Sequence, residues 1–375
     1  MRIFYQAPVS RRWIRQRPHF IADGLAERGH EIFWFYAAPP GACRYGRWNN
    51  GDDVEGLELP LVPFATRLRF AEHLNRKWIG WRLRGVRADA AIFTYPISWR
   101  WLPDHLRRIP CVFDCMDLLP EFGPPRVRKA MADAERSLAV AANAIVASSE
   151  PIARHLREDY GCEETPIEIV PNAARIPELS GAKPVPGLAR PSLVYVGTID
   201  AWFDWDSVLS AARNHPEWSF ELVGPVVARP EEAPGNIHFH GPVPHEAVAD
   251  WLVSADVLLI PFVRNRLVDA VDPVKMYEYL AAGKPIVSSW WPLLDRFSKF
   301  PAVSFYRVSD DAGMDGPALR SLEEAVLESL SGPERFAPPR DFLRENGWPA
   351  RIDRFEAIVS GLNRSFDTTG SSVRA

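Results

Sequence analysis

Cysteine is scarce in this chain. Its four cysteines are widely scattered, at Cys43, Cys111, Cys115 and Cys162. They form no Cys-x-x-Cys pair, so a disulfide framework and a thiolate zinc site are both unexpected, and reduced thiols in a cytosolic protein are the better interpretation. The nine histidines show no His-x-His or His-Glu-x-x-His spacing, which leaves a metal site without support.

Long apolar runs and a secretory leader are also missing. No run approaches the ~20 apolar residues that a membrane-spanning helix needs. Residues 1–5 have the pattern of a strand, and four arginines follow at once, at Arg11, Arg12, Arg15 and Arg17. A signal peptide would instead continue into an apolar core, so we expect a cytoplasmic protein. The first strand–helix unit also lacks the Gly-x-Gly-x-x-Gly turn of a standard dinucleotide site.

The composition is typical of a folded protein, but the charge is unevenly distributed. Of the 375 residues, 47% are hydrophobic and 25% charged, and the length suits about two domains. Residues 1–110 carry 18 basic against 10 acidic side chains, and the rest carry 26 against 38. The basic first part favours an anionic partner there. Nucleic acid is the least supported such partner, because no recognition motif accompanies the charge.

Strand-like and helix-like patterns alternate along the chain. Strands are predicted over 2–5, 31–36, 90–95, 111–114, 144–147 and 167–170, and again over 192–199, 219–225, 237–241, 257–260, 286–289 and 303–306. Helices are predicted between them, including 17–28, 125–142, 150–160, 245–254 and 348–363. The alternation predicts an α/β protein with two consecutive sheets. Ligands of such sheets bind beyond the carboxyl ends of the strands.

A stretch rich in proline and glycine divides the two series of strands. We predict a first Rossmann-like α/β/α lobe over residues 1–175, a linker over 176–191 and a second such lobe over 192–347. A final helix follows over 348–364, and the Ser/Thr/Gly-rich tail over 365–375 is predicted to be disordered. Two lobes of this kind enclose a cleft in which a ligand binds.

The segment from Asp272 to Gly283 has the pattern of a complete short helix. Asp272 is placed to act as N-cap, and Pro273 to take the first helical position. Gly283 suits the left-handed residue that ends a helix, and Pro285 prevents continuation. We therefore predict a helix with both ends encoded locally.

The start of this helix suits a phosphate. Backbone N–H groups and the helix dipole favour an anion there, and Lys275 adds a full positive charge. Glu278 lies three residues later on the same face, where its carboxylate can accept two neighbouring hydroxyls of a ribose. A plain amphipathic helix with a solvated Lys–Glu pair is the alternative.

Residues 65–87 combine basic and aromatic side chains. The segment holds seven Lys or Arg residues and one acid, interleaved with apolar residues. A basic amphipathic helix with tryptophan on its apolar side can lie on an anionic membrane. A surface helix with solvated arginines is the alternative. The residues expected to contact a membrane or an acceptor are Arg76, Lys77, Trp78, Trp81 and Arg82.

Two aspartates follow the predicted strand at 111–114. Asp117 stands just beyond the strand, where ligands of such sheets bind, and its carboxylate can act as a general base. In the alternative interpretation, Asp117 caps the next segment or holds a loop N–H. Asp114 lies within the strand end and is the second candidate base, although a structural role suits it better.

The order of these motifs resembles that of glycosyltransferases of the GT-B fold, especially the GT4 family and the teichuronic-acid-type bacterial enzymes. The resemblance spans nearly the whole chain and rests on the order of individually weak motifs. The motifs are Trp13–His19, Val112–Asp117, Tyr195–Asp204, Phe239–Glu246, Ala255–Phe262, Asp272–Val287 and Trp348–Arg351. The last of these resembles a helix that crosses back to the first lobe, which binds the acceptor in this family.

The resemblance implies a site for a nucleotide-diphosphate sugar in the second lobe. It makes Glu278 the ribose-binding residue and Lys275 a diphosphate contact that assists catalysis. The remaining donor-binding residues that it implies are Gly197 and Thr198 at the phosphates and Gly241, Pro242 and Val243 at the base. We also expect Val274 and Arg264 to bind the donor, because Arg264 flanks the donor loop, where it can bind a phosphate or an anionic sugar. Solvation of the loop arginine is the alternative for Arg264.

The chain departs from the family pattern at one position. Many GT4 enzymes have a second glutamate eight residues before the ribose-binding one, and here that position is Ala270. Retention or inversion at the sugar therefore stays open. The Asp204-Trp205-Asp206 motif is a tempting metal site, but such sites belong to the other glycosyltransferase fold, so we expect the two aspartates to cap a helix and expect no metal cofactor.

We therefore expect a metal-independent glycosyltransferase that acts on a glycan or lipid-linked acceptor in bacterial surface polysaccharide biosynthesis, at the inner face of the membrane. A non-hydrolysing sugar-nucleotide 2-epimerase is the first alternative, since it shares the two-lobed fold. A non-catalytic sugar-nucleotide-binding protein is the second, and it would not need a base at Asp117. No nucleic-acid partner is expected.

Overall fold

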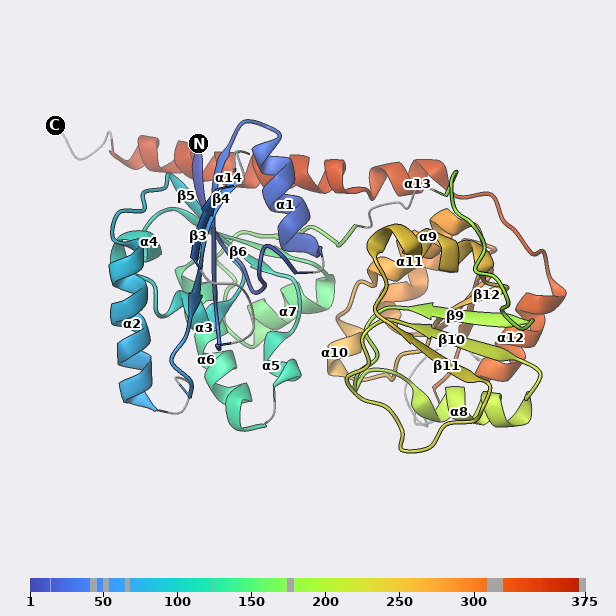
Figure 1. The fold of residues 1–375 in the computed structure, drawn as a ribbon. Helices are drawn as coiled ribbons and strands as arrows, with labels where there is room; N and C mark the ends of the chain where they lie inside the picture. Colours follow the sequence, from blue (N-terminus) through green and yellow to red (C-terminus); the bar gives the residue numbers. More distant parts are fainter. Residues whose placement is uncertain are drawn as a thin grey trace. The chain divides into compact units, whose positions relative to one another are not determined.

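The computed structural model describes residues 1–13, 15–40, 46–49, 54–64, 68–123, 125–173, 179–308 and 320–370. The chain divides into two compact units (Figure 1). Unit 1 comprises Met1–Asn172 together with Trp348–Ala375, and unit 2 comprises Ala173–Gly347. Each unit contains one predominantly parallel sheet connected by helices (Figure 1), so the predicted α/β class with two Rossmann-like lobes is confirmed. The cleft between the lobes stays a prediction.

The sheet of unit 1 has the strand order β3-β4-β2-β1-β5-β6-β7-β8. All neighbours pair in parallel except β3, which is antiparallel to β4. The strands are β1 (Arg2–Gln6), β2 (Glu31–Ala38), β3 (Gly46–Asn49), β4 (Val54–Pro60), β5 (Ala90–Phe93), β6 (Cys111–Cys115), β7 (Ala144–Ala147) and β8 (Ile167–Ile169).

The sequence pattern does not predict β3 and β4, because acidic residues interrupt the apolar positions of β4. One of them, Glu58, is only 1% exposed. Its carboxylate accepts hydrogen bonds from the Ser10 hydroxyl at 2.8 Å and from the Arg11 backbone N–H at 2.9 Å. A buried acid is tolerated here because distant residues supply its hydrogen bonds.

The helices of unit 1 differ from the predictions mainly at their ends. They are α1 (Arg17–Ala26), α2 (Arg69–Leu83), α3 (Pro96–Trp99), α4 (Asp104–Arg107), α5 (Leu119–Phe122), α6 (Pro125–Ala141), α7 (Glu150–Glu158) and α14 (Trp348–Gly370). Residues 365–370 continue α14, where the composition predicts a disordered tail. Once a helix is nucleated, each added residue costs little. The remaining tail, 371–375, lies outside the described residues.

Helix α14 packs on unit 1, although it follows unit 2 in the sequence. The ring of Trp348 stacks on Phe20 of α1 with centroids 4.8 Å apart. A Cβ on Gly24 would lie 2.1 Å from the terminal carbon of Ile352, so a glycine in α1 allows the two helices to approach closely. Arg354 Nε also donates to Glu168 of β8 at 2.8 Å.

The sheet of unit 2 has the order β11-β10-β9-β12-β13-β14, with every pair parallel. The strands are β9 (Ser192–Val196), β10 (Ser219–Val223), β11 (Ile237–Gly241), β12 (Val257–Ile260), β13 (Ile286–Ser289) and β14 (Val303–Tyr306). Chain order reverses between β9 and β12. This topological switch point is where open α/β sheets bind ligands.

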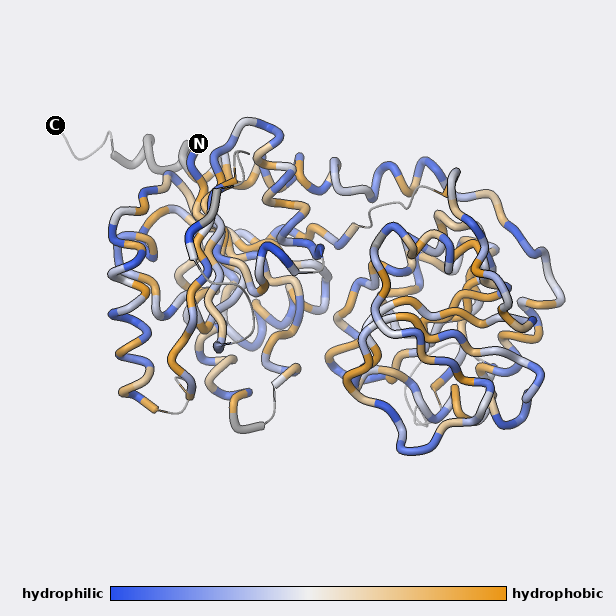
Figure 2. The backbone as a smooth tube through the Cα atoms, viewed as in Figure 1, coloured by the Kyte–Doolittle hydropathy of each residue, from blue (hydrophilic) through white to orange (hydrophobic). Residues whose placement is uncertain are grey.

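The helices of unit 2 connect these strands. They are α8 (Trp205–Asn214), α9 (His245–Ser254), α10 (Arg266–Asp269), α11 (Val274–Ala282), the 3₁₀ helix η1 (Pro292–Phe297), α12 (Leu322–Ser331) and α13 (Arg340–Glu345). Apolar residues concentrate along the strands of both units (Figure 2). Burial of these side chains stabilises each unit by roughly 25 cal/mol per Å² of apolar surface.

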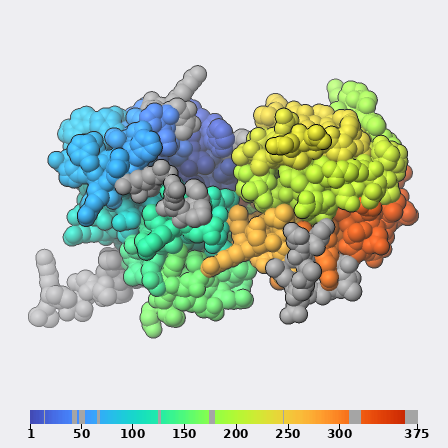
Figure 3. All heavy atoms as spheres, turned by 90° about the horizontal axis from the view of Figure 1, so that it is seen from below, coloured from blue at the N-terminus to red at the C-terminus, as the bar shows by residue number. Residues whose placement is uncertain are grey.

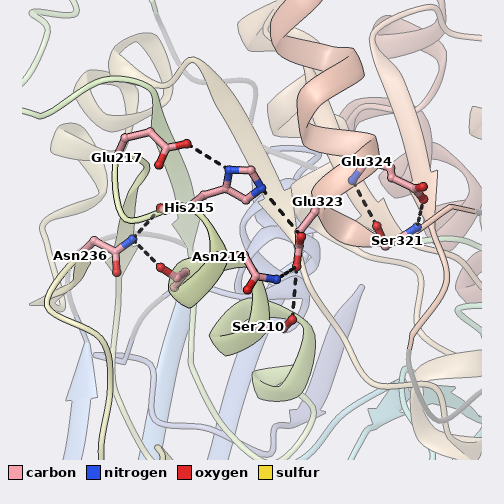
Figure 4. Close-up of polar contacts among 9 residues, drawn as sticks. Ser210, Asn214, His215, Glu217, Asn236, Ser321, Glu323 and Glu324 are labelled. Atoms are coloured by element: carbon pink, nitrogen blue, oxygen red, sulfur yellow. Dashed lines mark hydrogen bonds and ion pairs between the residues drawn. The ribbon is translucent and has the colours of Figure 1, made fainter.

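Polar contacts join α8 to α12 on unit 2 (Figure 4). The Glu323 carboxylate accepts from Asn214 at 2.9 Å and from the Ser210 hydroxyl at 3.2 Å. His215 lies between Glu323 and Glu217, at 3.8 and 3.0 Å, and its ring stacks on Trp218. These contacts give His215 a structural role.

Candidate functional site

The carboxyl ends of β9 and its neighbours in unit 2 bring three glycines together. Gly197, Gly224 and Gly241 each stand at or just beyond the end of a strand. The Gly197 N–H donates to Val223 at 2.7 Å, and the Gly224 N–H donates to Gly241 at 2.8 Å. A Cβ on Gly224 would lie 2.1 Å from the Gly197 carbonyl oxygen, so this close approach of two backbones requires glycine.

Lys275 of α11 lies directly against Gly197. A Cβ on Gly197 would lie 2.3 Å from Lys275 Cε and 2.6 Å from its Nζ, and Gly197 has φ +150°. The ammonium also lies 5.3 Å from the ring centre of Tyr195 and 5.5 Å from that of Phe262. Tyr195 lies near the end of β9 and Phe262 lies two residues beyond β12, so the lysine stands at the switch point of the sheet.

The Lys275 ammonium has no ion pair with any residue that the structure describes. Its side chain is half-buried, and burial lowers the pKa of Lys275, with the nearby Glu278 opposing that shift. A desolvated cation without a hydrogen-bonded counterion is costly, even where aromatic rings face it. The arrangement therefore suits an anionic ligand that would supply the missing partner.

Helix α11 begins one residue later than predicted, and its start is not capped by a side chain. Its N-cap is Pro273, with no side-chain hydrogen bond to the first turn. The prediction that Asp272 caps the helix is therefore wrong, because that carboxylate accepts from the Tyr277 hydroxyl at 3.0 Å and pairs with Arg296. The other end is as predicted, since Gly283 is left-handed with φ +64°.

Glu278 lies one turn further along α11. Its side chain is half-buried, and burial raises the pKa of Glu278 to about 7, against the opposing effect of the Lys275 ammonium. Because the two residues are three positions apart within α11, they lie on the same face of the helix. The site thus presents an ammonium near the helix start and a carboxyl group behind it.

The other predicted residues of unit 2 occupy different surroundings. The Thr198 carbonyl accepts from the Tyr195 hydroxyl at 2.7 Å, and Val274 is the first residue of α11. Pro242 is exposed and Val243 is partly buried just beyond β11. Arg264 Nε donates to Asp269 of α10 at 3.1 Å. Its role toward a ligand stays a prediction.

Sequence reasoning overlooked Gly224 and three aromatic residues of this site. Tyr195 and Phe262 flank the lysine, while the Tyr279 hydroxyl accepts the Val196 backbone N–H at 3.0 Å. A signal for Gly224 was present, because three successive strands end in glycine. The aromatic residues carry no such signal, because buried rings are common in any α/β core.

Unit 1 places Asp114 within the end of β6 and Asp117 just beyond it, in two different surroundings. Asp114 is fully buried and forms a salt bridge with Arg17 of α1, with Nη2 2.9 Å from Oδ1. Arg17 also donates to Asn172 at 3.2 Å and lies over the Phe355 ring. This pair therefore holds elements of unit 1 together, in agreement with a structural role for Asp114.

Asp117 has a carboxylate that is available for chemistry. The N-cap of α5 is Leu118, without a side-chain hydrogen bond, so the alternative in which Asp117 caps this helix is wrong. No described residue donates a hydrogen bond to the Asp117 side chain. Burial raises the pKa of Asp117 to about 7, although the Arg17 guanidinium opposes the shift. A pKa near neutrality suits a general base.

Helix α2 has three distinct sides. Ala71, Asn75, Ile79 and Leu83 recur every four residues and are buried against unit 1. A second stripe is exposed, with Phe70 at 74% and Trp81 at 54%. The basic residues Arg76, Lys77 and Arg84 are exposed beside that stripe. Figure 3 shows the light-blue segment that contains α2 on the surface of unit 1.

The two tryptophans of α2 stack on each other. Their ring centroids are 5.6 Å apart at 21°. The Arg82 guanidinium lies 5.4 Å from the ring centre of Trp78 and 6.0 Å from that of Trp81. None of the described helices is long and apolar enough to cross a membrane.

Two protein families match the two series of strands in chain order. The family described as "Glycosyl transferase 4-like domain" matches residues 14–173, and the one described as "Glycosyl transferases group 1" matches residues 190–293. Together the two matches cover more than half of the chain. This chain belongs to the GT4-like glycosyltransferases of the GT-B fold.

A curated relative agrees with this assignment. A protein of Bacillus subtilis (strain 168), named for a role in teichuronic acid biosynthesis as the glycosyltransferase TuaH, is 25% identical over 207 residues. The match covers 50% of this chain and 52% of that protein, so the chain matches about half the length of this curated relative.

Likeness to solved structures shows the fold. Sucrose-phosphate synthase from Thermosynechococcus elongatus has TM-score 0.67 at 14% identity, covering 99% of both chains. WaaG, a glycosyltransferase involved in lipopolysaccharide biosynthesis, has TM-score 0.61 at 15% identity, covering 98% of this chain and 99% of WaaG. An E. coli trehalose-6-phosphate protein bound with UDP-2-fluoro glucose has TM-score 0.64 at 12% identity, covering 96% and 99%.

Three further positions of this glycosyltransferase can now be placed. Ala270 is buried at the end of α10, where many GT4 enzymes have a glutamate. Asp204 is the N-cap of α8 and accepts from the Ser207 N–H at 3.1 Å, as predicted, whereas Asp206 lies in the first turn of α8, so the prediction that it also caps the helix is wrong. Burial lowers the pKa of His19 to about 4, and His19 Nδ1 accepts the Gln16 N–H, so this histidine is structural.

Proposed function

We propose that this glycosyltransferase takes its sugar from a nucleotide-diphosphate sugar bound at the β9–β12 switch point of unit 2. The observation that carries the proposal is the ammonium of Lys275, which has no ion-pair partner among the described residues, beside an uncapped helix start. A diphosphate would pair with the ammonium and accept from the first N–H groups of α11. Charge builds on the departing diphosphate as the glycosidic bond breaks, and these groups would stabilise it.

Glu278 would bind the ribose of the same donor. Its ionised carboxylate can accept hydrogen bonds from two neighbouring hydroxyls, and it lies one turn behind the diphosphate position. Lys275 favours the ionised form through its charge. The base would stack at Gly241–Val243, beyond the end of β11. The UDP-sugar analogue bound to the E. coli structural neighbour supports a nucleotide-sugar donor.

The acceptor would be a hydroxyl of a glycan or lipid-linked molecule in bacterial surface polysaccharide biosynthesis. The name of the Bacillus subtilis relative supports this class of pathway. Asp117 would take the proton from the attacking hydroxyl as the new bond to the sugar forms, and its pKa of about 7 suits that transfer. Metal would not be required, because Lys275 and the helix start would provide the compensating charge.

A panel of sugar nucleotides tests the proposal. Donors with uracil, guanine, adenine or thymine bases would be added singly, and the donor that binds should raise Tm by mass action. Transfer would then be measured with that donor and a panel of glycan and lipid-linked acceptors, with and without EDTA. Conversion of the donor to its 2-epimer without transfer would contradict glycosyl transfer, and activity lost with EDTA would contradict metal independence.

Gly197→Ala is expected to weaken diphosphate binding by at least about tenfold. The added Cβ would lie 2.3 Å from Lys275 Cε, so the lysine must move, and the φ of Gly197 disfavours alanine. Titration calorimetry with the nucleoside diphosphate of the preferred donor measures the effect. Gly235→Ala is the matched control, because a Cβ there meets nothing within 4 Å. Equal affinities for both variants would contradict the placement of the lysine at the phosphates.

We also propose that α2 binds an anionic membrane surface, which would bring the enzyme to a lipid-linked acceptor at the inner face of the membrane. The support is the exposed stripe with Phe70 and Trp81 next to exposed basic residues on the same helix. Such helices bury their apolar side in the headgroup region while their basic residues face anionic lipids.

Vesicle sedimentation tests this surface. Arg76→Glu with Lys77→Glu should lower binding to anionic vesicles by more than about tenfold, since each basic residue contributes roughly 1 kcal/mol. Phe70→Ser with Trp81→Ser should also release the protein. Trp13→Ser is the control, because Trp13 is 55% exposed on the same unit but outside α2. Equal retention of all variants, or equal binding to neutral vesicles, would contradict the proposal.

A further inference from the structure

The residues before α11 are held by a buried cluster that sequence reasoning did not foresee. An aspartate followed by proline at a helix start ordinarily accepts backbone N–H groups two or three residues further on. Here the Asp272 carboxylate, whose side chain is 1% exposed, points to other partners. It accepts from the Tyr277 hydroxyl at 3.0 and 3.2 Å and pairs with Arg296.

The segment around η1, which follows α11 in the sequence, holds the Asp272 carboxylate in this position. Arg296 lies in η1 and also donates to the Tyr277 hydroxyl at 2.8 Å. Its guanidinium stacks 4.7 Å from the ring centre of Phe297. Trp291, just before η1, donates from Nε1 to the Val271 carbonyl at 3.1 Å. Both Asp272 and the residue before it are thus held by this one segment.

We infer that Arg296 and Tyr277 are positioning residues that hold the Asp272 carboxylate away from the first backbone N–H groups of α11. The inference rests on the proposed function, because those N–H groups and Lys275 are the proposed diphosphate contacts. Without Arg296, the carboxylate would lose its salt bridge, and it could then turn to accept the N–H groups of Val274 and Lys275 itself. Turned toward the helix start, its negative charge would oppose the charge of the diphosphate.

The cluster therefore keeps the Asp272 carboxylate away from the first N–H groups of α11, although the local sequence places that carboxylate next to them. Arg296 is committed to Asp272 and Tyr277, so we assign it no direct phosphate contact. Removing Arg296 should weaken the binding of ligands that carry a diphosphate. It should leave the binding of the bare nucleoside unchanged, because the nucleoside does not contact the helix start. If Arg296 had a purely structural role, its removal would lower the affinity for both ligands alike.

Titration calorimetry tests the inference with three probes, the nucleoside, its monophosphate and its diphosphate, for the base that the wild type prefers. R296M should lower diphosphate affinity about tenfold or more and leave nucleoside affinity unchanged. The double variant D272A/R296M should recover diphosphate affinity to within about threefold of the wild type, because the competing carboxylate is gone. R296K, which keeps the charge, should bind like the wild type.

Arg344→Met is the matched control, because Arg344 pairs with Asp341 at an exposed site of the same unit. If R296M fails to fold, Y277F carries the test, since it removes only the hydroxyl and should also weaken the diphosphate selectively. Equal losses for nucleoside and diphosphate, or a double variant no better than R296M, would overturn the inference. A wild type that binds no nucleoside diphosphate would instead overturn the proposed donor site.

Discussion

Replacing Lys275 with methionine is expected to reduce kcat for sugar transfer by roughly 10²–10³, which corresponds to about 2.7–4 kcal/mol of lost transition-state stabilisation. The ammonium has no ion pair within the described part of the chain and lies at the switch point against Gly197. It would meet the charge that develops on the departing diphosphate. Methionine retains most of the side-chain volume and removes the charge, so a fall in kcat in steady-state kinetics would measure the effect of the lost charge.

The same substitution is expected to leave Tm of the ligand-free protein unchanged or to raise it. Burial lowers the pKa of Lys275, which means that the folded state disfavours the charged ammonium relative to the unfolded chain. Removing the charge removes that cost. The wild type should therefore gain more stability from a nucleoside diphosphate than the variant does.

Lys299→Met is the matched control for Lys275. Lys299 also lies over two aromatic rings, 5.3 Å from the ring centre of Phe300 and 5.2 Å from that of Phe342. It is exposed and lies in the same unit, outside the switch point. Its replacement should leave kcat unchanged. Full activity of the Lys275 variant would rule out this lysine as the diphosphate contact.

Asp117→Asn is expected to reduce transfer by about 10²–10⁴ while nucleotide binding is preserved, because the base acts on the acceptor. In the wild type the pKa of Asp117 is about 7, and the base must be ionised to take a proton. The transfer rate should therefore rise as pH increases through about 7 and level off above it. Rates measured from pH 5 to 9 would show this rise in the wild type and not in the variant.

Asp133→Asn provides the control for the aspartate substitution, because Asp133 is an exposed residue of α6 that pairs with Lys129. Its kcat and pH profile should match those of the wild type. An Asp117 variant with undiminished transfer would show that another group takes the proton. A variant that loses nucleotide binding as well would show that the substitution disturbs more than the base.

Much of the unit 2 site follows from local sequence. The strands alternate with helices in the order that predicts a parallel sheet, and glycines end successive strands. The three-residue spacing of Lys275 and Glu278 places both on one face of α11. The left-handed conformation of Gly283 is likewise encoded where it occurs, because only glycine adopts φ +64° without cost.

Other features depend on partners that are distant in sequence. The Glu58 carboxylate interrupts the apolar pattern of β4, and its burial is explained only by Ser10 and Arg11. Asp272 has the sequence context of a helix cap, but Arg296 draws its carboxylate elsewhere. A local pattern cannot report a contact that depends on where a later segment folds.

The sequence by itself determined the α/β class, the two series of strands and the ammonium–carboxyl pair on one helix, because these depend on residue periodicity and backbone preference. The tertiary structure decided that Lys275 stands at the β9–β12 switch point and forms no close ion pair among the described residues. It also decided that the start of α11 stays uncapped. Both outcomes depend on long-range packing, which sets the charge and burial that each side chain experiences.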